Sequence, residues 1–244
     1  DLTPIHYKLQ IANITGQQPT NYTQETEWFN TFLTRNRGHT SLKQNNIPTL
    51  TSDYALYWFD YLGGYDTILA QVGWNMSLNT QISLLRGAAT MQNKTWGAII
   101  SWKYNQAPYL DTGQNVYNQM KTAYNAGAKY IMVFNLAFDN QTDKPYGTMK
   151  NEHFQALQTF WKKVVTKQSP TQTHAEVALV LPKDYGWGMR SPDDKIWGFW
   201  GPDDKSPLIW NISQILLAKY GYGLDIIYDD PAYPIPGNYS QVYL

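Results

Sequence analysis

Three apolar segments alternate with amphipathic segments and organise the larger part of the chain. The apolar segments are residues 67–74 (TILAQVGW), 97–104 (GAIISWKY) and 129–136 (KYIMVFNL). Each is a nearly continuous apolar run, which is the pattern of a parallel β-strand buried on both faces. Between them, residues 80–91 and 113–126 carry apolar side chains at helical spacing. We therefore predict an α/β protein built from repeated strand–helix units around a parallel sheet.

The segments before these units continue the pattern. Residues 5–11 alternate apolar and polar side chains like a half-buried strand, and residues 22–36 have the spacing of a helix. Residues 47–50 form a short strand candidate, which is followed by a helix candidate at residues 54–62. Asp53 stands where it can cap that helix.

A polar, proline-containing stretch at residues 166–173 is the best candidate for a domain boundary. A new run of strands and helices follows it, at residues 176–181, 207–219, 224–228 and 241–244. We therefore predict a (β/α)-barrel-type domain at residues 1–168 and a smaller α/β domain at residues 174–244. The number of barrel strands is left open, so an incomplete barrel is one alternative.

Two helices allow a prediction of which face is buried. The apolar face of the helix at residues 151–166 consists of Phe154, Leu157, Trp161, Val164 and Val165. In the helix at residues 207–219, the apolar face consists of Leu208, Ile212, Ile215 and Leu216. We expect these side chains to pack into the core.

The chain closes on the predicted strand at residues 241–244. A chain that stops inside a strand predicts one of two things: the second domain is truncated, or its edge is completed by another chain. The second interpretation favours a homo-oligomer or a larger assembly.

Composition narrows the function classes. The formal net charge is zero and 16% of the residues are charged, against about 25% in an average protein. Nucleic-acid binding requires a basic surface and is therefore not expected. No apolar run approaches the roughly 20 residues of a membrane-spanning helix, so we predict no transmembrane segment. The 10 Trp and 19 Tyr suit carbohydrate binding, because aromatic ring faces stack on the apolar faces of sugars.

Metal and cofactor chemistry has little support in the sequence. The chain has no cysteine, and its four histidines are scattered without the spacing of a zinc site. Glycine-rich phosphate loops are also missing. We therefore expect no cofactor and no metal.

Acceptor sequences for N-linked glycans, Asn-x-Ser/Thr, are frequent. The seven acceptor asparagines are Asn13, Asn21, Asn75, Asn93, Asn140, Asn211 and Asn238. This density, together with the low charge, favours an extracellular glycoprotein, secreted or at the cell surface.

Side chains suited to ligand contact follow the three apolar strands. They are Trp74, Asn75, Trp102, Lys103, Tyr104 and Asn135. Because the carboxyl ends of parallel strands build the ligand site of α/β folds, we predict that these residues line one carbohydrate-binding cleft. In the alternative interpretation each aromatic ring packs under a loop, and Asn75 carries a glycan outside the cleft.

The segment at residues 182–205 contains an internal repeat, because SPDDK at 191–195 returns as GPDDK at 201–205. One interpretation is a loop that packs on itself and seals the domain interface. The other is an aromatic wall over a sugar-sized cleft, in which Trp187 and Arg190 contact the substrate.

Catalysis is harder to place. Glycoside cleavage usually requires two carboxyl groups, one acting as acid and one as base or nucleophile. None of the four glutamates lies at the carboxyl end of a predicted strand. Asp53 is the best remaining acid, although it serves equally as a helix cap. Gln71 stands where an acidic residue would be expected, and an amide cannot transfer a proton.

Residues 53–161 resemble the TIM-barrel glycoside hydrolases, most closely a poorly characterised prokaryotic branch. The resemblance rests on DYLGGYDTILAQVGWN, RGAATMQNKTWGAIISWKY, YNQMKTAYNAGAKYIMVFN and EHFQALQTFW. It implies a TIM-barrel-type domain, and the residues after 176 look like the flavodoxin-like α/β domain that follows the barrel in several such enzymes. Gln71 departs from the acidic residue that the resemblance leads us to expect.

Two hypotheses follow for the function. The first is an extracellular carbohydrate-active protein of glycoside hydrolase ancestry, which binds or hydrolyses a glycan at the carboxyl ends of its parallel strands, with Asp53 and Gln71 at the catalytic position. The second is a catalytically inactive, glycosylated cell-surface or assembly protein that retains the glycosidase-like fold.

Overall fold

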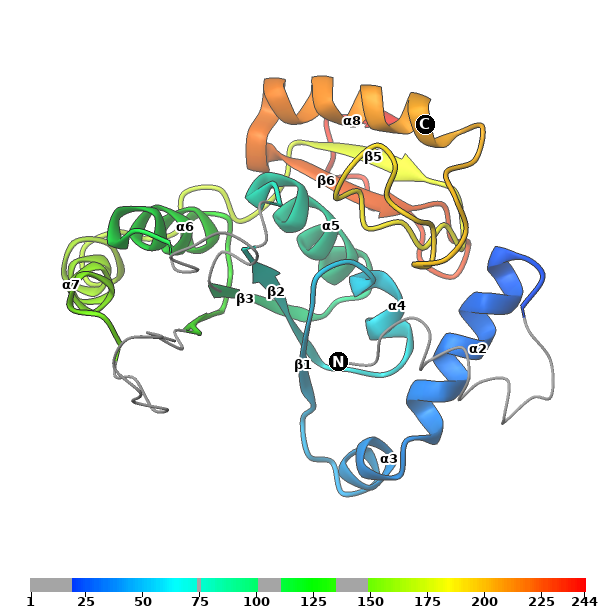
Figure 1. Cartoon of the computed structure of the whole chain (residues 1–244), viewed down its shortest axis with the longest axis horizontal. Helices are drawn as coiled ribbons and strands as arrows, with labels where there is room; N and C mark the ends of the chain where they lie inside the picture. Colours follow the sequence, from blue (N-terminus) through cyan, green and yellow to red (C-terminus); the bar gives the residue numbers. More distant parts are fainter. Residues whose placement is uncertain (1–18, 74–75, 101–110, 135–148) are drawn as a thin grey trace, which may run out of the picture.

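The computed structural model describes residues 19–73, 76–100, 111–134 and 149–244, which form a mixed α/β structure with two parallel sheets (Figure 1). The first sheet has the order β1 (Leu50–Asp53), β2 (Thr67–Val72), β3 (Thr95–Ile100) and β4 (Tyr130–Val133). In the second, β5 (Val177–Leu181) lies between β6 (Leu224–Tyr228) and β7 (Gln241–Tyr243). Every strand pair in both sheets is parallel.

The helices of the described part are α2 (Tyr22–Arg35), α3 (Arg37–Gln44), α4 (Tyr57–Leu62), α5 (Leu78–Met91), α6 (Gly113–Asn125), α7 (Asn151–Phe160) and α8 (Ser206–Tyr220). A π-helical turn, Trp161–Val165, continues α7, and a 3₁₀ turn, Gly221–Gly223, follows α8. Four of the described helices begin in the same way, with a side-chain oxygen that accepts a backbone N–H three residues later. The capping residues are Asn21 before α2, Asn36 before α3, Ser77 before α5 and Thr112 before α6.

The alternation of strands and helices agrees with the sequence pattern, but two elements differ from the prediction. The short strand predicted at residues 47–50 lies at Leu50–Asp53 instead. Pro48 has no backbone N–H, and the N–H of Thr49 donates to the carboxylate of Asp66 at 2.8 Å, so pairing with β2 begins only at Leu50. Helix α3 was not predicted because its sequence, RGHTSLKQ, is polar apart from Leu42.

Two further predictions concern the first sheet. The strand predicted at residues 5–11 lies outside the described residues. Within the described ranges the first sheet is open, and its four strands do not close into a barrel.

Helix α5 lies between the two sheets (Figure 1). It packs on β2 and β3 of the first sheet and on β6 of the second. Its side chains Ile82, Leu85 and Ala88 are fully buried. A Cβ at Gly87 would lie 2.4 Å from the carbonyl oxygen of Ile226 in β6, so only glycine allows this approach of helix to strand.

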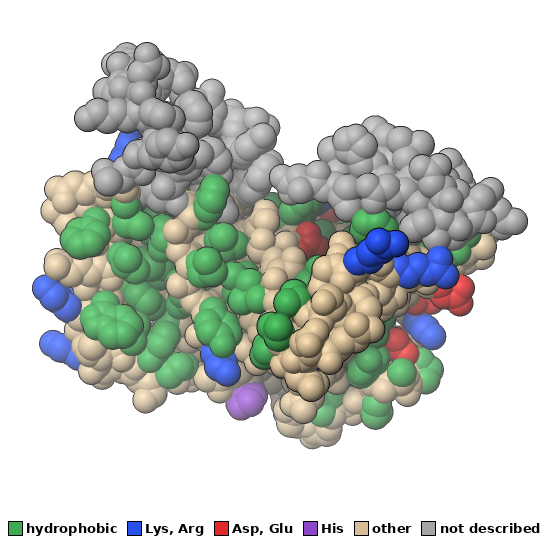
Figure 2. Space-filling view, turned by 90° about the horizontal axis from the view of Figure 1, so that it is seen from below, with side chains coloured by type: hydrophobic (Ala, Val, Ile, Leu, Met, Phe, Trp, Pro, Cys, Tyr) green, Lys and Arg blue, Asp and Glu red, His purple; other side chains and the backbone are tan. Residues whose placement is uncertain are grey.

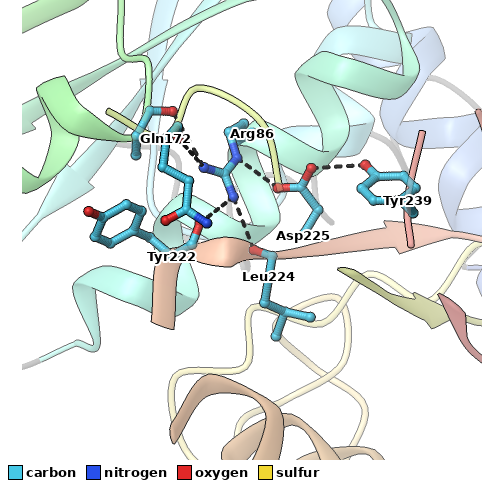
Figure 3. A network of polar contacts seen from close by, with 7 residues as sticks. Arg86, Gln172, Tyr222, Leu224, Asp225 and Tyr239 are labelled. Carbon is cyan, nitrogen blue, oxygen red and sulfur yellow. Dashed lines mark hydrogen bonds and ion pairs between the residues drawn. The ribbon is translucent and has the colours of Figure 1, made fainter. Parts of the chain in front are cut away.

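A buried ion pair accompanies this close packing (Figure 3). Arg86 of α5 donates from Nε to Oδ1 of Asp225 in β6 at 2.8 Å, and both side chains are 1% exposed. Asp225 also accepts from the hydroxyl of Tyr239 at 2.8 Å. Burial raises the pKa of Asp225, an effect that the charge of Arg86 opposes. The attraction between the two side chains therefore offsets part of the cost of removing both charges from water.

The guanidinium of Arg86 also binds backbone carbonyls from three separate segments. It donates to Gln172 at 3.3 Å in the connection between the two sheets, and to Tyr222 and Leu224 around the start of β6. It lies 3.4 Å from the carbonyl of Ala126, at the end of α6. One side chain thus fixes the position of α6, the connecting segment and β6 relative to α5.

The buried faces of α7 and α8 agree with the prediction only in part. Phe154 and Trp161 are 54% and 60% exposed, and Leu208 and Ile215 are 63% and 67% exposed. Val164 is buried as predicted, while α7 buries His153, Ala156 and Phe160 and packs on α6. Because α8 is apolar on nearly all sides, its sequence pattern does not select a single face: Leu216 is buried as predicted, together with Ser213 and Leu217.

One face of the first sheet is only partly covered by the described residues. Helices α4, α5 and α6 pack on the other face, where Ile68, Ala98 and Ile100 are buried. On the partly covered face, Tyr130, Met132 and Phe134 are 43–49% exposed. In the view from below, hydrophobic side chains gather over the half of the molecule that holds α6 and α7 (Figure 2).

No helix within the described ranges has both the length and the apolar character needed to cross a membrane.

Replacing Arg86 by leucine should reduce the free energy of unfolding by about 3–5 kcal/mol, because Asp225 is left as a buried, unpaired charge. Lys94→Met is the matched control. Lys94 lies 3.8 Å from Asp66 and is 28% exposed, so its loss should cost less than about 1 kcal/mol. Urea unfolding followed by circular dichroism measures both. Equal losses in the two variants would contradict a special role for the buried pair.

Gly87→Ala should destabilise the protein by several kcal/mol, because the added methyl group meets backbone rather than a movable side chain. Gly201→Ala is the control, since nothing lies within 4 Å of a Cβ built there. The midpoint of thermal unfolding of each variant tests this. A midpoint for Gly87→Ala at or above that of the parent protein would show that α5 and β6 pack less closely than described.

Candidate functional site

A pocket of about 540 Å³ lies between α2, the end of β1 and α4 on one side and the loop that follows β5 on the other. We call it the carboxylate pocket. It is lined by Phe29, Phe32 and Leu33 of α2, by residues 52–56 at the end of β1, by Asp60 of α4, and by Gly186, Gly188, Arg190, Ser191, Asp193, Asp194, Lys195, Trp197 and Gly198 of the loop. Pockets of this size between two structural units are the common location of small-molecule sites.

The loop at residues 182–205 is built to hold its shape. Trp187 and Trp197 are buried, and their indole N–H groups donate to the backbone carbonyls of Asp194 and Asp184, both at 2.9 Å. Asp184 and Trp197 adopt positive φ angles of 62° and 55°. The loop therefore packs on its own tryptophans, as the first interpretation of the segment predicted.

The same loop is fastened to α2 on the other side of the pocket. The hydroxyl of Thr23 donates to Oδ2 of Asp184 at 2.8 Å. The rings of Phe29 and Trp197 lie 5.6 Å apart, and Tyr22 contacts Trp200 edge to face at 5.3 Å. These contacts join residues far apart in the sequence and bring the loop over the end of β1.

Asp53 ends β1 and is half buried. Its Oδ1 accepts from the N–H of Tyr54 at 2.7 Å, and its Oδ2 accepts from the N–H of Leu56 at 3.0 Å. The helix begins at Tyr57 and not at residue 54, so Asp53 stabilises the turn that leads into α4. The carboxylate is held in a fixed orientation at the carboxyl end of a parallel strand.

Asp60 is the partner of Asp53. It belongs to α4, is 6% exposed, and lines the carboxylate pocket. Burial raises the pKa of Asp60 well above its ordinary range, and the charge of Asp53 and a hydrogen bond between the two carboxyl groups raise it further. Asp60 Oδ2 has no hydrogen-bond partner among the described residues. Asp60 therefore keeps its proton at pH values where an ordinary aspartate is ionised.

Tyr57 packs beside this pair. It is fully buried, and its hydroxyl donates to the amide oxygen of Gln81 in α5. Burial raises the pKa of Tyr57, and the negative charges of Asp53 and Asp60 add to the effect, while Arg190 opposes it. Tyr57 therefore remains neutral, and its hydroxyl is engaged with Gln81.

Arg190 and Asp194 form the opposite side of the carboxylate pocket. The guanidinium donates from Nε to Asp194 Oδ2 at 2.8 Å and from Nη2 to Oδ1, and the backbone N–H of Arg190 also donates to Oδ2. The guanidinium lies 5.2 Å from the ring centre of Tyr54. Both oxygens of Asp194 are thus occupied, while the Arg190 side chain remains one-third exposed.

The structure brings together some of the residues predicted for the site. Asp53 and Arg190 both line the carboxylate pocket. Gln71 of β2 lies behind it, because its amide donates to the hydroxyl of Ser52 at 3.0 Å and Ser52 is a lining residue. Trp187, predicted to contact substrate, is fully buried. Its ring supports the loop from inside because its N–H is used within the loop.

The remaining predicted contact residues, Trp74, Asn75, Trp102, Lys103, Tyr104 and Asn135, lie outside the described residues. So do the acceptor asparagines Asn13 and Asn140. The four described acceptor asparagines, Asn21, Asn93, Asn211 and Asn238, are all exposed.

Sequence reasoning missed Asp60, although a signal was present. Helix α4 reads YWFDYL, in which Asp60 is the one charged residue among buried aromatic and aliphatic side chains. A carboxylate in such a segment requires a partner or a proton. Without the fold, nothing indicated that this partner is Asp53.

Within the described part of the chain, no group of three or more His, Cys, Asp or Glu side chains is arranged to hold a metal ion.

Comparisons with known proteins give no assignment. No family model, curated protein or solved structure matches the chain.

Asp60→Asn should stabilise the protein at neutral pH. The pKa of Asp60 is raised in the folded state, so its contribution to stability is complete below the pKa of the unfolded chain, about 3.9. That contribution is lost as the pH rises toward the pKa of the folded state. An asparagine can keep a hydrogen bond to Asp53 without ionising. Urea unfolding between pH 4 and pH 8 should therefore show a flatter profile for the variant, and parallel profiles would contradict the prediction.

Proposed function

We propose that the protein is an extracellular carbohydrate-active protein of glycoside hydrolase ancestry, and that it binds its glycan in the carboxylate pocket. The observation that carries the proposal is that the buried carboxyl group of Asp60 and the carboxyl group of Asp53, at the end of β1, line the same pocket of about 540 Å³. A buried carboxyl group with a raised pKa is suited to act as a general acid toward a ligand in that pocket.

The arrangement of strands supports a barrel-type ancestry for the first domain. Four parallel strands in the order of the sequence, β1–β2–β3–β4, are the arrangement found in (β/α)-barrels. In the second sheet the first strand is central, with the next two on either side. That is how a flavodoxin-like sheet begins. We propose a TIM-barrel-type domain at residues 1–168 and a flavodoxin-like domain at residues 174–244.

The walls of the carboxylate pocket suit an uncharged polyhydroxyl ligand. Phe29, Phe32 and Leu56 offer apolar surface, while Ser52, Ser191 and the carboxyl groups offer hydrogen bonds. Sugars present an apolar ring face and a rim of hydroxyl groups and need both kinds of wall. In hydrolysis, Asp60 would protonate the glycosidic oxygen, and the Asp53 carboxylate would stabilise the positive charge that develops on the sugar ring.

The extracellular location is proposed because the chain has many acceptor asparagines for N-linked glycans. All four in the described residues are exposed, which is compatible with glycan attachment. We also propose an assembly through β7, because among the described residues this strand pairs only with β5 and its other edge is open to a further strand.

The second candidate is a binding protein that has lost catalysis. Gln71 favours it, because the amide at this strand position is engaged with Ser52 and cannot exchange a proton. In that case the carboxylate pocket binds a glycan and leaves it intact.

The two candidates are separated by measuring binding and hydrolysis on the same panel of soluble glycans. We expect Asp60→Asn to reduce the rate constant of hydrolysis roughly 100-fold or more, because a general acid contributes at least this much, with little change in binding. Asp229→Asn is the control, since Asp229 follows a strand in the same way but is exposed and does not line the pocket.

Each outcome has a distinct meaning for the proposal. Binding without hydrolysis by the parent protein selects the second candidate. Gln71→Glu then tests whether an acidic residue at that position restores hydrolysis. If the parent protein neither binds nor cleaves any glycan of the panel, the carbohydrate proposal is wrong in both forms.

A further inference from the structure

Helix α8 presents an apolar face to water on the outside of the second sheet (Figure 1). It packs on β6 and on the 3₁₀ turn that follows it, where Leu216 and Leu217 are buried. On the other side of the helix, Leu208 and Ile215 are 63% and 67% exposed. The helix has no charged residue before Lys219, whereas the outer face of a surface helix is normally charged. Exposure of this face costs free energy, and a group that covers it would remove that cost.

An acceptor asparagine for N-linked glycans lies within this face. Asn211 is exposed, and it follows Leu208 by three residues and precedes Ile215 by four, so the three side chains share one side of the helix. The rise along the helix is about 4.5 Å from Leu208 to Asn211 and about 6 Å from Asn211 to Ile215. Because helical side chains lean toward the N-terminus, Asn211 leans toward Leu208, and Ile215 leans toward Asn211. A group attached to Nδ2 of Asn211 therefore reaches both apolar side chains.

A glycan on Asn211 suits this face better than a protein partner does. Sugar rings have an apolar face that can contact Leu208 and Ile215, while their hydroxyl groups remain in water. Such a glycan makes the outer side of α8 hydrophilic without any charge in its sequence. It also excludes a protein partner, because it occupies the centre of the face that the partner would need. The place of the acceptor sequence between the two most exposed apolar side chains of α8 favours the glycan.

Building on the proposed extracellular location, we propose that Asn211 carries an N-linked glycan whose first sugars cover Leu208 and Ile215 and prevent α8 from associating with another chain. In the transfer, a bond forms from Asn211 Nδ2 to the anomeric carbon of a sugar that is held as a lipid-linked phosphate. The bond from that carbon to the phosphate oxygen breaks, and the lipid phosphate and one amide proton are released.

The folded helix indicates when this transfer takes place. The acceptor sequence Asn-Ile-Ser includes Ser213, which is fully buried and whose hydroxyl donates to the backbone carbonyl of Trp210 at 2.7 Å. The transferring enzyme has to reach the whole acceptor sequence. The sugar is therefore attached before α8 folds against β6.

The first part of the test locates the glycans on the full chain, expressed in its natural host. Mass spectrometry of its peptides identifies the modified acceptor asparagines, and we expect Asn211 to be modified in most molecules.

The second part measures the apparent mass of the parent protein and its variants by light scattering. Asn211→Gln removes the glycan and keeps an amide on the helix, and we expect its apparent mass to be roughly twice that of the parent protein, since two exposed α8 faces can pair by two-fold symmetry. Replacing Leu208 and Ile215 by glutamine in the same variant should restore the parent mass. An assembly through β7 would be common to all of these proteins and would not alter the comparison.

Asn93→Gln is the matched control. Asn93 is an exposed acceptor asparagine in the turn after α5, and the charged Lys94 follows it, so removal of a glycan there uncovers no apolar helix face. This variant should keep the apparent mass of the parent protein.

The outcomes separate this inference from the proposals on which it rests. An unmodified Asn211 beside glycans on other acceptors would overturn the inference and leave the extracellular location standing. The absence of glycans from every acceptor would overturn the inference together with the argument for that location, while the carbohydrate function of the carboxylate pocket would be unaffected. A modified Asn211 whose loss leaves the apparent mass unchanged would overturn the covering role. So would association of Asn211→Gln that persists after both apolar side chains are replaced.

Discussion

The ion pair between Arg86 and Asp225 is the interaction on which the arrangement of the two sheets depends. It lies where α5 approaches β6 most closely, and it is completed by backbone carbonyls from the segment between the sheets. Removing two charges from water costs several kcal/mol each, so the pair is favourable only with every donor satisfied. That requirement fixes one relative position of the two halves of the chain.

The carboxylate pocket is a consequence of this position. Asp53 and Asp60 belong to the first half, and Arg190 and Asp194 belong to the loop after β5. The contacts of the loop with α2, through Thr23 and Phe29, hold the two sides together at the end of β1. The chemistry that we propose therefore depends on packing between segments far apart in the sequence, because the raised pKa of Asp60 depends on its burial.

The proposed site also has a cost in stability, which fits a functional role. Asp60 is a carboxyl group in a helix of buried apolar side chains, and one of its oxygens is without a hydrogen-bond partner among the described residues. Natural proteins retain such groups where their chemistry is used, because an apolar or amide side chain would stabilise the fold more. In the loop at residues 182–205, the two buried tryptophans donate hydrogen bonds to backbone carbonyls of the loop and support its conformation. Arg190 of the same loop lines the pocket.

The sequence alone determined the α/β class, the parallel character of the strands and the position of most helices, because apolar runs and helical periodicity are local signals. It also identified Asp53 and Arg190 as candidates. It selected the buried faces of α7 and α8 only in part, because apolar side chains occur on more than one side, and it could not identify α3, which is polar apart from Leu42. Only the tertiary structure decided that Asp60 meets Asp53 and that Trp187 is enclosed by its own loop. The reason is that the pKa of a carboxyl group and the exposure of a ring depend on neighbours brought by other segments, which no local pattern of residues contains.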